Sequence, residues 1–118
     1  MFQSNLARLA ARARARWVMI AGSDGVLLET DSRAFRTEAE AIAAQFASLF
    51  RISRKVAGDT ESGGLQSALL VTEQGKILLQ ALNEDYILIL FLEPDSHAGK
   101  AFFEISRAAG PIEKELRY

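Results

Sequence analysis

Residues 17–28 read Trp17-Val18-Met19-Ile20-Ala21-Gly22-Ser23-Asp24-Gly25-Val26-Leu27-Leu28, two apolar runs on either side of an Asp-Gly pair. Asp24 and Gly25 are residue types that supply the positive φ angles of a tight hairpin turn. The first run is apolar without alternation, as expected of a strand that is covered on both faces. This stretch therefore predicts a β-hairpin whose first strand is buried.

A second apolar group, residues 65–92, predicts three strands joined by short turns. The strands are expected at 65–72, 76–82 and 86–92, with turns at Gln74-Gly75 and Asn83-Glu84. The last of the three is apolar throughout, so we expect it at the centre of one antiparallel sheet, together with the strand at 17–21. The strand at 65–72 is left at an edge, where its backbone can pair with a second chain.

Two helices are predicted before and between these strand groups. Apolar residues recur at helical spacing from Phe2 to Trp17, which predicts an amphipathic first helix. Thr37-x-x-Glu40 matches a capping box, in which each side chain satisfies a backbone amide at a helix start. A long helix is therefore expected from this point to about Ala57.

A third helix is predicted after Pro94-Asp95-Ser96, with a kink or short break at Gly110-Pro111 because proline lacks the amide hydrogen. The predicted fold class is α+β. It has a single five-stranded antiparallel sheet with helices on both faces, in the order helix-strand-strand-helix-strand-strand-strand-helix. We expect one domain over residues 1–118.

The long helix carries two stripes at helical spacing. The bulkier stripe is expected to face the core and comprises Ile42, Phe46, Leu49, Ser53 and Val56. The other lies about 90° around the helix and comprises Ala39, Ala43, Ala47 and Phe50. Small side chains at four-residue spacing would let a second helix approach closely, although alanine is also simply favoured in helices. Both interpretations stay open.

Composition limits the classes of function. The chain has 118 residues, 49% of them hydrophobic, and a net charge of -1, so a nucleic-acid-binding role is not expected. It has no cysteine, and its longest strongly apolar run is far shorter than the roughly 20 residues of a membrane helix, which favours a cytoplasmic protein without an integral membrane segment. The first helix and its end carry a set of arginines for which a solvated face is the favoured reading, with an acidic partner or membrane as the alternative: Arg8, Arg12, Arg14 and Arg16.

No residue set indicates catalysis. His97 is the only histidine, which excludes a multi-histidine metal site. Gly58 and Gly63 have the spacing of a phosphate-binding loop, but Gly64 and Leu65 stand where lysine and serine or threonine would contact phosphate and Mg²⁺. We therefore predict no enzyme activity, no cofactor and no GTP binding by this chain.

The order of these segments resembles the roadblock/dynein light-chain family over nearly the whole chain. The matching stretches are residues 18–28 (VMIAGSDGVLL), 38–41 (EAEA), 72–80 (TEQGKILLQ) and 85–91 (DYILILF), the last followed by Glu93-Pro94-Asp95. Because these stretches are hydrophobic patterns and turns, the specificity of the resemblance comes from their order. The Gly110-Pro111 step departs from the uninterrupted last helix that is usual in the family.

The resemblance implies a homodimer in which the long helices pack together and the edge strands join two sheets into one. The interface residues predicted on this basis are Ala39, Ala43, Ala47, Phe50, Leu65, Ser67, Leu69 and Val71. Family members commonly regulate or scaffold small Ras-like GTPases, so the implied role is partner binding. The predicted contact surface is the outward side of the long helix: Glu40, Ala44, Ser48, Arg51 and Lys55.

The sequence is also compatible with two other functions. One is a small-ligand sensor domain, because several sensor modules share this architecture of a single sheet covered by helices. The other is a purely structural subunit of a larger assembly.

Overall fold

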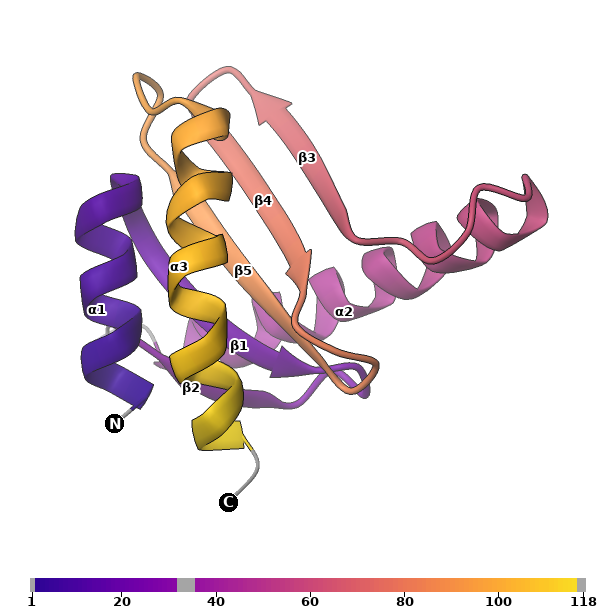
Figure 1. The fold of residues 1–118 in the computed structure, drawn as a ribbon, viewed down its shortest axis with the longest axis horizontal. Helices are drawn as coiled ribbons and strands as arrows, with labels where there is room; N and C mark the ends of the chain where they lie inside the picture. Colours follow the sequence, from indigo (N-terminus) through magenta and orange to yellow (C-terminus); the bar gives the residue numbers. More distant parts are fainter. Residues whose placement is uncertain (1, 32–35, 117–118) are drawn as a thin grey trace.

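The computed structural model describes residues 2–31 and 36–116, which form the predicted order of elements (Figure 1). The helices are α1 (Phe2–Ala13), α2 (Arg36–Asp59) and α3 (Ala98–Leu116). The strands are β1 (Ala15–Gly22), β2 (Leu27–Thr30), β3 (Ser67–Thr72), β4 (Gly75–Ala81) and β5 (Tyr86–Leu92). The predicted α+β fold class is confirmed. Within the described residues, no helix has the length and apolar character needed to cross a bilayer.

The five strands form one antiparallel sheet in the order β2-β1-β5-β4-β3. Strand β5 is the middle strand and pairs with β1 along its whole length, and β3 lies at one edge, as predicted. Helices α1 and α3 lie side by side over one face of the sheet, and α2 lies behind the other (Figure 1).

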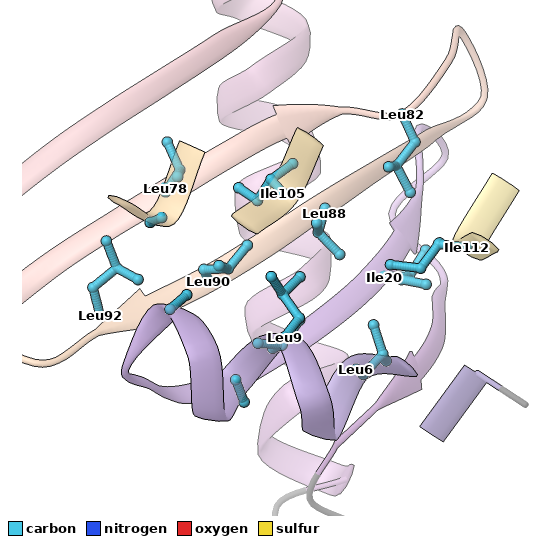
Figure 2. Packing of buried hydrophobic residues seen from close by; sticks show 14 residues of the cluster. Leu6, Leu9, Ile20, Leu78, Leu82, Leu88, Leu90, Leu92, Ile105 and Ile112 are labelled. Atoms are coloured by element: carbon cyan, nitrogen blue, oxygen red, sulfur yellow. The ribbon is translucent and has the colours of Figure 1, made fainter. Parts of the chain in front are cut away.

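Alternation along β5 divides the core into two layers. Leu88, Leu90 and Leu92 point toward α1 and α3, whereas Ile87 and Ile89 point toward α2. Figure 2 shows the first layer, where leucines of α1 meet those of β5. A central strand is apolar at every position because both of its faces are covered, which explains the uninterrupted runs in β1 and β5.

The β1–β2 turn differs in one detail from the prediction. Within this turn only Gly25 has a positive φ, of 92°. Asp24 contributes through its side chain instead, because its Oδ1 accepts a hydrogen bond from the Val26 amide at 3.1 Å. Aspartate commonly bonds its own backbone two residues on in this way. The hairpin prediction is therefore confirmed, but the positive φ assigned to Asp24 was wrong.

Two helix ends also differ from the sequence pattern. Helix α1 ends at Ala13, where Arg14 adopts a φ of 57°, so Trp17 belongs to β1 and not to the helical face. A kink or a short break was predicted at Gly110-Pro111; helix α3 continues through Pro111 to Leu116, so the helix is not broken there. Ile112 is fully buried and Leu116 packs on the same cluster, and these contacts hold the last turns in place despite the missing amide.

Candidate partner-binding surface

The buried face of α2 is its small-residue stripe. Ala39, Ala43, Ala47 and Phe50 are each at most 2% exposed and share a cluster with sheet residues that include Ile89. Small side chains allow the helix to approach the sheet of its own chain closely. The prediction that this stripe meets a second helix was therefore wrong, because these four side chains are already covered within one protomer.

The exposed apolar side of α2 is the part of the bulky stripe that was expected in the core. Leu49 is 37% exposed, Val56 is 54% exposed, and Ile52 beside them is 63% exposed. Ile42 and Phe46 do pack, in part, against the α2-side cluster. The core assignment of Leu49 and Val56 was therefore wrong, and we call Leu49, Ile52 and Val56 the α2 ridge.

An aromatic cluster flanks the packed part of the same stripe. The ring of Phe91 lies 4.9 Å from that of Trp17 and 5.8 Å from that of Phe46, with interplanar angles of 66° and 73°. Such edge-to-face pairs are the preferred arrangement of aromatic rings. All three side chains are only half-buried, so the exposed apolar surface of α2 continues onto the neighbouring residues of β1 and β5.

Strand β3 offers an unpaired edge, because its described backbone partner is β4 alone. Leu69 and Val71 are 42% and 70% exposed, whereas Leu65 and Ser67 are half-buried. Leu70 packs toward the α2-side cluster, so Leu69 and Val71 face the other side of the sheet.

The residues predicted to contact a GTPase form one exposed row on α2. This partner row comprises Glu40, Ala44, Ser48, Arg51 and Lys55. Arg51 Nη2 donates to the Ser23 carbonyl at 3.2 Å, and Lys55 Nζ lies 2.7 Å from Asp59 Oδ2. The two cations are therefore held on the surface by bonds within the chain. The row lies roughly 110° around the helix from the α2 ridge.

Arg54 joins α2 to two hairpin loops and was not singled out from the sequence. Its Nη1 donates to Ser23 Oγ at 3.4 Å and to the Glu84 carbonyl at 3.3 Å, and its Nη2 donates to the Asn83 carbonyl at 3.2 Å. The guanidinium also lies 4.9 Å from the centre of the Phe50 ring. Arg54 therefore fixes the C-terminal half of α2 against the β1–β2 and β4–β5 turns.

An Arg54→Met variant is expected to lower the free energy of unfolding by about 1–2 kcal/mol, because the stem is kept while the bonds to two loops are lost. Urea unfolding followed by circular dichroism would measure this change. Lys55→Met is the matched control, because its single ion pair is exposed and contributes little. Equal stability of the two variants would contradict the structural role of Arg54.

Other polar groups have structural roles. Burial raises the pKa of Asp31, although hydrogen bonds from the backbone amides of Val18 and Asp31 itself and from the Thr30 hydroxyl oppose the shift. Asp31 Oδ1 accepts the Val18 amide at 2.9 Å and so fastens the end of β2 to β1. Among the described residues, no three histidine, cysteine, aspartate or glutamate side chains gather into a possible metal site.

Comparison with known proteins identifies related folds. A family model for the Roadblock/LC7 domain matches residues 1–91. Among solved structures, Myxococcus xanthus MglB aligns with a TM-score of 0.88 at 13% identity, covering 98% of this chain and 94% of that chain. A Roadblock/LC7 domain from Streptomyces avermitilis aligns with a TM-score of 0.89 at 12% identity, covering 98% of each chain.

The gliding protein mglB of Thermus thermophilus aligns with a TM-score of 0.82 at 15% identity, covering 94% of this chain and 84% of that chain. A search of curated proteins found no significant match. At these identities the structural likeness shows a common fold.

Proposed function

Because this chain belongs to the Roadblock/LC7 domain family, we propose that it is a non-catalytic dimeric regulator or scaffold that binds a small Ras-like GTPase. The observation that carries the proposal is the exposed α2 ridge, which lies on the helix that leads into the unpaired strand β3. Exposed apolar side chains that are grouped, and not scattered, mark interaction sites.

The proposed dimer differs in one respect from the sequence-based version. The α2 ridges of two copies pack together in place of the alanine stripes, while the β3 edges pair through the region of Leu65, Ser67, Leu69 and Val71. Antiparallel pairing of identical strands about a two-fold axis satisfies the free backbone groups of both edges. Burial of Leu49, Ile52 and Val56 supplies the apolar contribution.

The proposed GTPase contact uses the partner row. Since this row lies roughly 110° around the helix from the α2 ridge, it stays accessible when the ridges are covered. Resemblance to a family whose members commonly regulate or scaffold Ras-like GTPases supports the choice of partner. We also propose a cytoplasmic location, where such a partner would be met.

Reversing both cations of the partner row, as Arg51→Glu/Lys55→Glu, is expected to slow association with the GTPase about tenfold or more, because charge complementarity acts mainly on the association rate. Stopped-flow or surface-binding kinetics would measure it. Lys100→Glu/Arg107→Glu changes the net charge equally on the opposite side of the molecule. If both pairs slow association equally, the partner row is not the contact surface.

The proposed function is tested by a pull-down from native cytosol, followed by binding of the recovered GTPase in its GDP and GTP forms. Preferential binding to one nucleotide form, together with absence of GTP binding by this chain alone in calorimetry, is the expected result. Recovery of a large complex without a GTPase would favour a structural subunit. A rise in melting temperature with a small metabolite would favour a sensor domain.

A further inference from the structure

The outer face of the α1–α3 layer is strongly basic. Five exposed cations lie on it, and we call them the basic face: Arg8, Arg12, Lys100, Arg107 and Lys114. The three on α3 are spaced by seven residues, which places them along one line of the helix over about 21 Å. Helices α1 and α3 run side by side on the same side of the sheet, so the two sets share one surface (Figure 1).

The two arginines on α1 face the same cleft as α3. Arg8, Arg12 and Arg107 line a hollow of about 100 Å³ between the helices, together with Glu104. Glu104 is only 8% exposed, so it offsets one charge from below without covering the cations. The cleft therefore carries three exposed positive charges at its rim and one negative charge at its floor.

Acidic residues are sparse around the basic face. Helix α1 contains no aspartate or glutamate in its sequence FQSNLARLAARA. On α3, Glu115 is half-buried and accepts a hydrogen bond from Asn5 Nδ2, and Glu113 is half-buried about 120° around the helix from the line of cations. A chain with a net charge of -1 thus concentrates positive charge on one surface.

Ion pairing among the described residues also sets the basic face apart. Among the residues that the structure describes, none of the five takes part in an ion pair. The two neighbouring arginines behave differently: Arg14 lies 2.8 Å from Asp95 and Arg16 lies 3.2 Å from Glu93. The basic face therefore has charge available for an external anionic partner.

A large aromatic side chain stands within the basic face. Phe103 is 58% exposed, lies between Lys100 and Arg107 along α3, and has the Arg107 guanidinium 5.8 Å from its ring centre. Aromatic side chains flanked by basic residues suit the boundary between lipid headgroups and acyl chains. The phosphate groups of a duplex nucleic acid would use the cations, but its bases are already stacked and would leave the exposed ring without a role.

We propose that the basic face binds reversibly to an anionic lipid surface, with Phe103 entering the headgroup layer. Each basic residue near such a surface raises the partition coefficient about fivefold, and the attraction falls off within a Debye length. Five cations therefore support peripheral binding that salt weakens. Because α1 and α3 lie side by side over one face of the sheet, the cations of both helices can approach one plane (Figure 1).

Dimerisation would strengthen this binding, a step that rests on the proposed function. A two-fold axis perpendicular to a continuous sheet keeps the α1–α3 layers of both copies on the same side. Two basic faces would then meet one membrane together, while α2 and the partner row face away from it. Binding through two linked sites is tighter than through either alone.

The test is sedimentation with vesicles of phosphatidylcholine alone and of phosphatidylcholine mixed with phosphatidylglycerol. Binding to the mixed vesicles, weak binding to the neutral ones, and release by added salt are expected. Arg8→Gln/Arg12→Gln should lower the partition coefficient about 30-fold, and Lys100→Gln/Arg107→Gln by a similar factor. Arg51→Gln/Lys55→Gln, which removes the same charge from α2, is the matched control and should leave binding unchanged.

Phe103→Ser tests the aromatic contribution separately. This variant should have a lower partition coefficient on the mixed vesicles. The ratio of its partition coefficient to that of the unchanged protein should stay the same as salt is raised, because the contribution of the ring is not electrostatic. The proposal fails if neutral vesicles bind equally well or if the control pair loses as much as the α1 pair. It also fails if the protein ignores anionic vesicles and binds duplex DNA, which would assign the basic face to nucleic acid. Loss of GTPase binding would leave this result unaffected, and a monomer should still prefer the mixed vesicles, although it should bind them more weakly than a dimer.

Discussion

An Ala43→Glu variant is expected to lose its folded structure. Ala43 is fully buried between α2 and the sheet, in a cluster with Met19 and Ile89. A glutamate there would bring an unpaired carboxylate and its extra side-chain atoms into an apolar layer, and the cost of several kcal/mol is a large part of a typical domain's total stability. Circular dichroism and thermal unfolding would show the loss.

Ala41→Glu is the matched control for this experiment. Ala41 lies on the same helix two residues away and is exposed, so its replacement should change the melting temperature little. The pair also separates two models of α2. If Ala43→Glu stayed folded and only became monomeric, the alanine stripe would be an interface between protomers after all.

An Ile52→Asp variant is expected to dissociate the proposed dimer while the protomer stays folded. Ile52 is 63% exposed in the single chain, so the substitution disturbs no core contact. In the dimer it would remove an apolar side chain from the centre of the α2 ridge and place a charge there. Loss of about 1.5–3 kcal/mol of burial and the added cost of desolvating the carboxylate together weaken association about 100-fold or more.

Analytical ultracentrifugation at several micromolar concentrations would measure this change, with circular dichroism confirming the fold. Val26→Asp serves as the control, because Val26 is an equally exposed apolar residue, at 65%, but lies at the β1–β2 turn. Val26→Asp should remain dimeric. Dissociation of both variants, or of neither, would remove the α2 ridge from the interface.

Much of the fold followed from local patterns. The apolar runs at 17–21 and 86–92 predicted the two strands that pair at the centre of the sheet, and the looser pattern at 65–72 predicted an edge. These predictions succeed because the two faces of a strand report directly on what covers them. Of the kink or short break predicted at Gly110-Pro111, the break does not occur, because the missing hydrogen bond is local, whereas the packing of Ile112 that outweighs it is tertiary.

The candidate surface was harder to predict. Arg54 gives no signal in the sequence, because its partners Ser23, Asn83 and Glu84 are about thirty residues away in either direction. Only part of the basic face could be recognised from the sequence, namely the two arginines on the first helix. The cations of α3 belong to the same surface only because the fold places α1 and α3 side by side over one face of the sheet (Figure 1).

The sequence by itself determined the order of the elements, the central and edge strands, and the presence of two stripes on the long helix. The tertiary structure alone decided which stripe is buried. Helical periodicity states which residues share a face but not how the helix is rotated against its neighbour. The bulky isoleucines, leucines and Met19 of the sheet leave room for methyl groups opposite Ala39, Ala43 and Ala47. These three therefore turn inward with Phe50, which follows them on the same stripe, and Leu49, Ile52 and Val56 remain outside.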